Sequence, residues 1–461
     1  MQSKMRAFPA SPTSGPADYE SSHGAVLAWY GLGVLLMTTL LALVIRQMLS
    51  LIAPSLQSTL SFTDLQIGML QGLGMAIFAC IASYPMGWLA DRFGRRLILA
   101  IGVGIWSLAT FFCAFQDSFG GLFIGTVGIA IGEAGLAPIV YAMIPDLFPE
   151  RKRNTANLIF YAGFMLGAGL GMALGGALLQ WLASSPDSLP EWLKGVDSWR
   201  IAMGLIAIPG PLFFLLIMRM PVARQRLPVR RGHSEGGANE ALLDALPYAK
   251  AHWRTLACVF GSIFAMAVAM ASGLTWFPLA LPRAFSIDPA TVGIGLGTAI
   301  TVATLVGVFL PGLALKLGQY AGGIPPIRVA SFFVWMTPLA AAFLPFTASP
   351  FQAYMVAAFQ AAMGIAGSAL MPGIIQDLAP AHLRSRVLAL LGIVNALALA
   401  ASPLAIGLIS GMIVGPRGML YSITIVSVPS LVAAAILISL AWRPYAMTVR
   451  AVRSGVSGEE I

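Results

Sequence analysis

Two ionisable residues, Arg46 and Glu133, stand out because each lies inside a long apolar stretch of the sequence. A charge at the centre of a membrane-spanning helix costs about 2.5–3.5 kcal/mol on insertion scales, so such a residue usually has a partner or a function. A guanidinium at this depth suits an anionic group, whereas a carboxylate can carry a proton. Two interpretations stay open: a structural ion pair, or a cavity site where a substrate anion competes with Glu133 for Arg46.

Other polar and aromatic residues in apolar stretches are Tyr30, Gln71, Tyr141, Tyr161, Trp276, Gln360 and Asn395. For this group, hydrogen bonding between helices or an interfacial position is the general expectation. We retain Tyr161, Trp276 and Asn395 as candidate substrate contacts. Pro278 follows Trp276 by two residues. Because a proline interrupts the backbone hydrogen bonds of a helix, we expect a bending point for an outer gate there.

The chemistry of an enzyme has no support in the sequence. The four histidines lie in predicted tails or loops, without the spacing of metal ligands. The three cysteines lie in apolar runs, which indicates neither a disulfide framework nor a metal site. A Gly-x-x-x-x-Gly-Lys-Ser/Thr phosphate loop does not occur. We therefore expect no enzyme, no metal and no cofactor.

Composition places the chain in a membrane. Of its 461 residues, 58% are hydrophobic and 10% are charged, whereas soluble domains carry about 25% charged residues. The mean hydropathy is +0.84. The net charge of +9 is read as an excess of Lys and Arg in cytoplasmic loops and not as a nucleic-acid surface. We expect a multi-pass membrane protein in the cell membrane, the inner membrane if the source is bacterial.

Stretches free of Asp, Glu, Lys and Arg delimit the expected spans. They are 25–45, 65–90, 97–116, 118–132 with its continuation to 145, 154–186, 201–218, 255–282, 289–315, 329–376, 387–416 and 418–442. A membrane helix needs about 20 apolar residues, so the run 329–376 divides in two at Pro345 and Ser349-Pro350. The sequence therefore predicts an all-α integral membrane fold of twelve transmembrane helices.

Charge sets the expected orientation. With the N-terminus inside, 22 Lys and Arg residues fall in cytoplasmic segments and 4 fall outside, so both termini are expected in the cytoplasm. The expected domains are a cytoplasmic N-terminal tail (1–24), a six-helix bundle (25–220), a cytoplasmic linker (221–253), a second six-helix bundle (254–442) and a cytoplasmic C-terminal tail (443–461).

The two halves resemble each other at an offset of 231 residues. The segment Pro145-Asp146-Leu147-Phe148-Pro149 returns as Gln376-Asp377-Leu378-Ala379-Pro380, and basic residues follow each copy, including Arg153 and Arg384. Each copy joins the fourth and fifth expected helices of its half. Parallel repeats of this kind are typical of transporters that move two bundles around a central site.

The loop between the second and third expected helices reads Gly87-Trp88-Leu89-Ala90-Asp91-Arg92-Phe93-Gly94-Arg95-Arg96. Positive-inside charge explains the arginines, but not the acid beside them or the two glycines seven residues apart. The stretch resembles the helix 2–3 loop signature of the major facilitator superfamily. Together with the twelve expected spans and the repeat, the resemblance covers about residues 25–442. The resemblance implies alternating access, with helices 1, 4, 7 and 10 lining the cavity. It also implies a cytoplasmic gate formed by Gly87, Asp91, Arg92, Gly94, Arg95 and Arg96, with Asp146, Arg153, Asp377 and Arg384 in the repeated loop.

A finer resemblance is to the spinster-like branch. Gly132-Glu133-Ala134, Ser61-Phe62-Thr63-Asp64 and Ser402-Pro403 are similar to segments of that branch, whose members are associated with sphingolipid or lysolipid export. Two positions depart from it. Ile45 stands where an acid usually precedes the arginine, and Thr126 stands where an arginine usually lies seven residues before the glutamate. Proton coupling by the usual route is therefore in question.

Together these features predict a secondary transporter that moves an amphipathic substrate, lysolipid-like or sphingolipid-like, or an organic anion. The alternatives are proton-coupled uptake of a small organic acid, and a non-transporting receptor or scaffold of the same fold. The expected partners are a small-molecule or lipid-like substrate and the bilayer, with protons as a candidate coupling ion and no nucleic acid. We expect a monomer.

Overall fold

The computed structural model describes residues 22–184, 190–220, 248, 250–320, 323–378 and 384–454. Within these residues, 12 helical segments are long and apolar enough to cross a membrane. The sequence predicted this number, and it also predicted that the run 329–376 holds two spans. The structure divides that run into Pro326–Phe346 and Pro350–Leu378.

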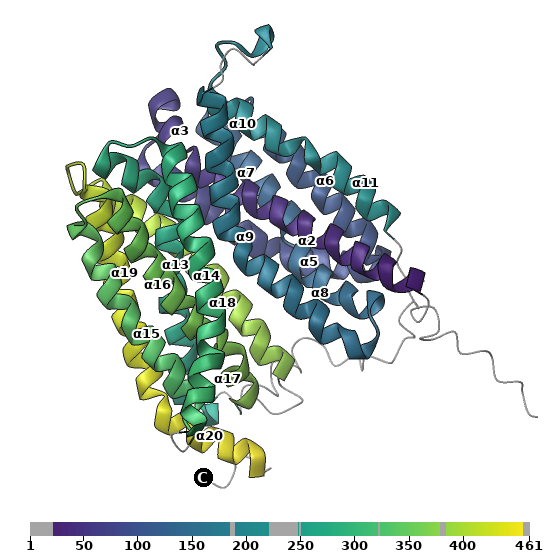
Figure 1. The fold of residues 1–461 in the computed structure, drawn as a ribbon, viewed down its shortest axis with the longest axis vertical. Helices are drawn as coiled ribbons and strands as arrows, with labels where there is room; N and C mark the ends of the chain where they lie inside the picture. The colour runs from purple at the N-terminus through teal and green to yellow at the C-terminus, as the bar shows by residue number, and fades with distance from the viewer. Residues whose placement is uncertain are drawn as a thin grey trace, which may run out of the picture.

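Six spans form the N-terminal half (Figure 1). The first is α2 (Ser22–Leu51), followed by the short α3 (Ala53–Leu60). The second combines α4 (Asp64–Met69), the π-helical η1 (Leu70–Ile77) and α5 (Phe78–Phe93). The third is α6 (Arg95–Cys113), and the fourth joins α7 (Phe119–Glu133) to α8 (Leu136–Leu147). The fifth is α9 (Glu150–Ser184), then come η3 (Glu191–Leu193) and the sixth span, α10 (Ser198–Ala207) with α11 (Pro209–Arg219).

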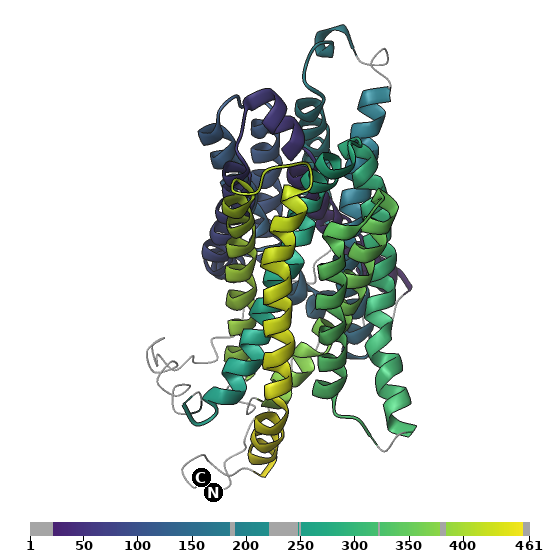
Figure 2. The same cartoon turned by 90° about the vertical axis from the view of Figure 1, so that its left-hand side faces the viewer.

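Six more spans form the C-terminal half. They begin with α13 (Trp253–Phe285), α14 (Pro289–Tyr320) and α15 (Pro326–Phe343), which ends in η4 (Leu344–Phe346). The tenth span joins α16 (Pro350–Ala369) to α17 (Met371–Leu378), and α18 (Arg384–Ser410) and α19 (Gly418–Leu440) follow. The last helix, α20 (Trp442–Ser454), continues from the lower end of α19 in Figure 2.

Local sequence explains where spans begin. The Ser349 hydroxyl accepts a hydrogen bond from the Gln352 backbone N–H at 3.3 Å, and Pro350 occupies the first turn, so α16 has an N-cap where the sequence predicted a break. At the start of α4, Thr63 and Gln66 form a reciprocal capping box. These caps satisfy N–H groups that a helix terminus leaves without intrahelical partners.

The two halves form separate bundles that meet at one end of the molecule. Figure 1 shows the bundles together near α3 and α10, and diverging toward α8, α17 and α20. In the orientation predicted from the charge bias of the sequence, the diverging end faces the cytoplasm, and we call the opposite end the outer end. The predicted linker, residues 221–253, lies largely outside the described residues. The predicted C-terminal tail, 443–461, contains most of α20.

Candidate functional site

The two ionisable residues predicted at membrane depth lie against each other. A guanidinium nitrogen of Arg46, on α2, is 3.9 Å from the carboxylate oxygen Oε2 of Glu133, the last residue of α7. The Arg46 side chain is 36% exposed and that of Glu133 is 11% exposed. The separation is that of an ion pair and too long for a hydrogen bond. The second carboxylate oxygen, Oε1, is buried and has no hydrogen-bond partner within the described part of the chain.

This pair is incompletely satisfied. A guanidinium offers five N–H donors in a planar fork that matches two oxygens of an anion. The Arg46 side chain is the more exposed partner of the pair, and the Glu133 side chain is the more buried one. The arrangement can therefore take a further anionic group on Arg46 without first removing Glu133 from its site.

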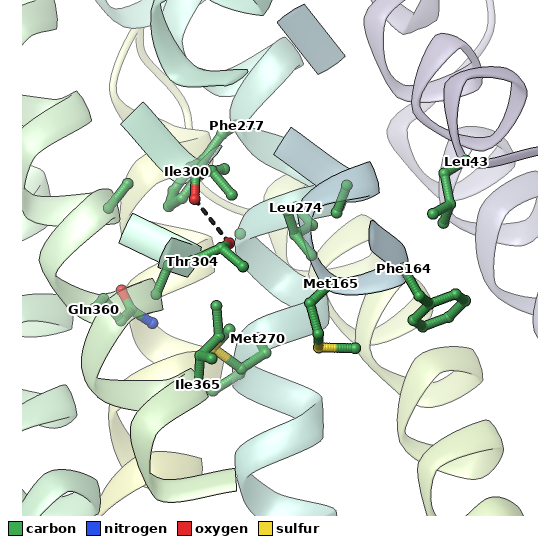
Figure 3. Close-up of a pocket in the computed structure, with 15 residues that line it drawn as sticks. Leu43, Phe164, Met165, Met270, Leu274, Phe277, Ile300, Thr304, Gln360 and Ile365 are labelled. Atoms are coloured by element: carbon green, nitrogen blue, oxygen red, sulfur yellow. Dashed lines mark hydrogen bonds between the residues drawn. The ribbon is translucent and has the colours of Figure 1, made fainter. Parts of the chain in front are cut away.

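An apolar cavity of about 210 Å³ lies between the halves (Figure 3). Leu43, three residues before Arg46, lines it from α2, and Met165 lines it from α9. The other side comes from α13, α14 and α16, with Met270 and Phe277 as large apolar side chains. The polar side chains in the lining are Thr304 and Gln360, and the Thr304 hydroxyl donates to the carbonyl of Ile300 at 2.8 Å. The cavity therefore suits an apolar group.

The remaining predicted substrate contacts lie elsewhere. Trp276 is fully buried on α13, close enough to α4 that a Cβ on Gly68 would lie 3.4 Å from its ring. Tyr161 on α9 and Asn395 on α18 are half-buried. Within the described chain, the three form no hydrogen bond with Arg46 or Glu133, and they are outside the cavity lining. Their role as substrate contacts stays a prediction.

A charged cluster joins the two halves at the outer end. Two guanidinium nitrogens of Arg283, at the end of α13, donate to the two carboxylate oxygens of Asp64, at the start of α4, at 2.7 and 3.2 Å. Gln57 of α3 bonds both partners, accepting from Arg283 at 2.5 Å and donating to Asp64 at 2.6 Å. Sequence reasoning missed this cluster. Its signal was Arg283 itself, one of only four basic residues expected outside.

Close backbone packing extends this contact between the halves. A Cβ on Gly72 of η1 would lie 2.6 Å from the carbonyl oxygen of Ala400 on α18. A Cβ on Gly176 of α9 would lie 2.7 Å from the backbone nitrogen of Ile294 on α14. Neither position has room for a side chain. We call these contacts between η1 and α18 and between α9 and α14 the outer seam, and they hold the outer ends together.

The predicted cytoplasmic gate residues of the N-terminal half make their contacts within that half. Arg95 donates to Asp146 at 2.8 Å and to the carbonyl of Ala142 at 2.7 Å, and it lies 3.6 Å from Asp91. Asp91 is 69% exposed. Gly94 joins α5 to α6 with φ of 105°, a backbone conformation that favours glycine.

The other gate residues follow the same pattern. Arg92 stacks on Trp88, 5.2 Å from the ring centroid, Arg96 donates to the carbonyl of Met220 at 3.0 Å, and Arg153 donates to the carbonyl of Phe148 at 3.1 Å. Gly87 has open space around it. In the C-terminal half, Asp377 accepts from the Tyr445 hydroxyl of α20 at 3.1 Å. The side chain of Arg384 lies outside this description.

In the orientation predicted from the sequence, the described residues have an inward-facing arrangement. Hydrogen bonds and ion pairs between described residues of the two halves are at the outer end. The gate motif at the cytoplasmic end bonds only within its own half in the part of the chain described. The motif was predicted to form a cytoplasmic gate, and that role stays a prediction.

Comparison with known proteins agrees with the fold. The family model of the Major Facilitator Superfamily matches residues 35–403. The sphingosine-1-phosphate transporter SPNS2 of Mus musculus is 32% identical over 222 residues, which is 46% of this chain and 37% of that protein. Protein spinster of Drosophila melanogaster is 28% identical over 243 residues, which is 52% of this chain and 36% of that protein. The matches thus span little more than a third of these relatives.

A solved structure shows the same fold over almost the whole chain. The crystal structure of a bacterial homologue of the human lysosomal transporter spinster, in an inward-facing and unoccupied conformation, has a TM-score of 0.71 and 21% sequence identity. The comparison covers 93% of this chain and 98% of that one. With the family match, the twelve spans and the loop motif, the conclusion is direct: the chain belongs to the major facilitator superfamily and is a multi-pass membrane transporter.

Proposed function

We propose that this protein transports an amphipathic organic anion by alternating access, with the anionic group on Arg46 and the apolar part in the adjacent cavity. The observation that carries the proposal is the position of Arg46. Its guanidinium lies beside Glu133 at 3.9 Å, and Leu43, one turn earlier on α2, lines the apolar cavity. One substrate can therefore meet a charge and an apolar wall within one helical turn.

The size and lining of the cavity favour a chain over a ring system. Its volume of about 210 Å³ is below the roughly 300–1,000 Å³ typical of sites for drug-sized ligands. Methionines at 165 and 270 supply flexible, polarizable walls that adapt to an irregular apolar group. A small organic acid would find its charge partner on Arg46 but no polar partners in this lining other than Thr304 and Gln360.

The names of the relatives point in the same direction. SPNS2 is described as a transporter of sphingosine-1-phosphate, a lipid that carries a phosphate. We extend only the chemical class, a single-chain lipid with an anionic head, to this protein.

Glu133 is the proposed proton carrier. An anion bound to Arg46 would weaken the attraction between Arg46 and Glu133, and this favours protonation of the carboxylate as substrate binds. Ile45 is fully buried, so the position that carries an acid in spinster-like relatives is closed to solvent here. Thr126 is buried and donates to the carbonyls of Leu122 and Phe123, so it supplies no charge. Coupling therefore depends on one carboxylate.

A binding test separates the two substrate classes. Thermal stabilisation of the purified protein is measured with lysophosphatidate, with monoacylglycerol of the same chain, and with short organic acids such as succinate. We expect lysophosphatidate alone to raise the melting temperature, because it combines an anion with a chain. Arg46→Gln should abolish the rise. Stabilisation by succinate and not by lysophosphatidate would overturn the proposal in favour of small organic acids.

A further inference from the structure

Gln71, on the π-helical segment η1, contacts the same face of α2 that carries Arg46. The Ser50 hydroxyl donates to the Gln71 amide oxygen Oε1 at 2.8 Å. Ser50 lies four residues after Arg46, and residues at this spacing share a face of a helix. Gln71 is therefore held about one turn beyond the ion pair, on the outer side.

One end of the Gln71 amide lacks a partner. Its nitrogen Nε2 is buried and has no hydrogen-bond partner among the described residues. Exchanging the amide oxygen and nitrogen does not remove this deficit, because Ser50 satisfies one end of the group and leaves the other. An unpaired buried donor destabilises the structure that contains it. Glu133 likewise has a buried polar atom without a hydrogen-bond partner, its acceptor oxygen Oε1.

The segment that carries Gln71 also packs against α7, the helix of Glu133. A Cβ on Gly74 of η1 would lie 3.0 Å from the hydroxyl oxygen of Thr126. Thr126 precedes Glu133 by seven residues, which is two helical turns, and so lies on the same face of α7. Segment η1 therefore covers the faces of α2 and α7 that carry the ion pair. π-helical segments are rare and frequently occur at functional sites.

The same segment belongs to the outer seam. Gly72, next to Gln71, is pressed against the Ala400 carbonyl of α18. When the halves separate at the outer end, this backbone contact must be lost, and the surroundings of Gln71 change with it. Gln71 thus lies between the ion pair and the seam.

On the basis of the proposed transport of an amphipathic anion, we propose that Gln71 is a further substrate-binding residue. Its free amide N–H donates to an acceptor oxygen of the substrate head group, a phosphate oxygen or the ester or hydroxyl oxygen beside it. Ser50 is a positioning residue that fixes which end of the amide is free. The transport site then consists of the polar side chains of Arg46, Glu133 and Gln71 and the apolar cavity that Leu43 lines from the same helix as Arg46.

The experiment compares Gln71→Leu, Ser50→Ala and the control Gln180→Leu, whose site is exposed near the outer end of α9. Melting temperature is measured without lipid, and affinity is measured with lysophosphatidate. We expect Gln71→Leu to keep or raise the melting temperature, since it removes an unpaired buried donor, and to weaken lysophosphatidate binding about tenfold. Ser50→Ala should weaken binding by about threefold, and Gln180→Leu should change neither quantity.

A purely structural Gln71 gives the opposite pattern. Gln71→Leu would then lower the melting temperature and leave the affinity for lysophosphatidate unchanged, which would overturn the proposal. Failure of the proposed function is a separate result, seen in the wild-type protein as stabilisation by succinate alone. In that case the affinity of Gln71→Leu for succinate decides the role of Gln71: a tenfold loss supports it, and an unchanged affinity rejects it.

Discussion

Arg283 and Asp64, 219 residues apart in the chain, form a two-nitrogen ion pair that bridges the halves at the outer end. Arg283 lies in the last turn of α13, and Asp64 is the first residue of α4. Since this pair exists only when the outer ends meet, it stabilises the inward-facing state relative to the outward-facing one. The Arg283 side chain is 36% exposed and that of Asp64 is 14% exposed, and ion pairs that solvent reaches contribute about 0.2–1 kcal/mol.

Asp64→Asn should shift the protein toward the outward-facing state. The substitution keeps the shape of the side chain and removes its charge, so the expected population change is at most about fivefold, which corresponds to 1 kcal/mol. The measurement is labelling from outside by a membrane-impermeant maleimide of a single cysteine at Ala400→Cys, in a background without reactive native cysteines. Ala400 is buried in the outer seam here. Labelling should become faster.

The matched control is Asp117→Asn. Asp117 pairs with Arg200, also at the outer end, but both residues belong to the N-terminal half. Its loss should leave the labelling rate unchanged. Equal acceleration by both variants would mean that outer surface charge in general, and not the bridge between halves, sets the rate.

Gly176→Ala should prevent the outer ends from closing. The added Cβ would lie 2.7 Å from a backbone nitrogen and 2.8 Å from a backbone oxygen of α14, and backbone atoms cannot rotate away. Overpacking of this kind typically costs about 1–3 kcal/mol, so transport should fall by roughly tenfold or more while the outward-facing state gains population. Gly33→Ala is the control, because nothing lies within 4 Å of its added Cβ. Transport by Gly176→Ala at the wild-type rate would contradict the packing argument.

Hydropathy and charge were sufficient to predict the spans and to single out the two charged residues of the candidate site. Membrane burial requires apolar stretches, and so the twelve spans were readable from the sequence. The pairing of Arg46 with Glu133 was one of two open interpretations, since each buried charge needs a partner, and the structure places the two side chains 3.9 Å apart. The break at Ser349-Pro350 was also readable, since serine and proline are typical of helix starts.

Contacts between the halves were not predictable in the same way. The Asp64–Arg283 bridge depends on which ends of the bundles meet, and local patterns carry no information about that. The loop motif named Asp91 and Arg95 as gate residues, but a motif does not specify a state. Here Arg95 is bonded to Asp146 in its own half. Gln71 was read as a residue for helix–helix hydrogen bonding, and only the structure shows that one amide end is left unpaired.

Glu133→Gln should abolish transport driven by a pH gradient. The amide cannot take up or release a proton, yet it keeps the size of the side chain, so substrate binding at constant pH should persist. Uptake into proteoliposomes with and without an imposed pH gradient measures the difference. Glu191→Gln, at an exposed outer position beside Lys194, is the control and should behave like the wild type. Wild-type gradient-driven rates from Glu133→Gln would remove it as the proton carrier.

Ala361→Phe should make the transporter discriminate against long chains. Ala361 lines the apolar cavity from α16 and is 9% exposed. A phenyl ring there would occupy a large part of the roughly 210 Å³ available. Lysophosphatidates of increasing chain length report the effect: affinity for the longest should fall by roughly tenfold, since each excluded CH₂ forfeits about 0.8 kcal/mol of burial. The shortest should bind as in the wild type, because Arg46 remains. The control is Val302→Phe, at a 60% exposed position of α14, which should leave the dependence of affinity on chain length unchanged. An equal loss of affinity at all chain lengths in Ala361→Phe would place the lipid chain outside this cavity.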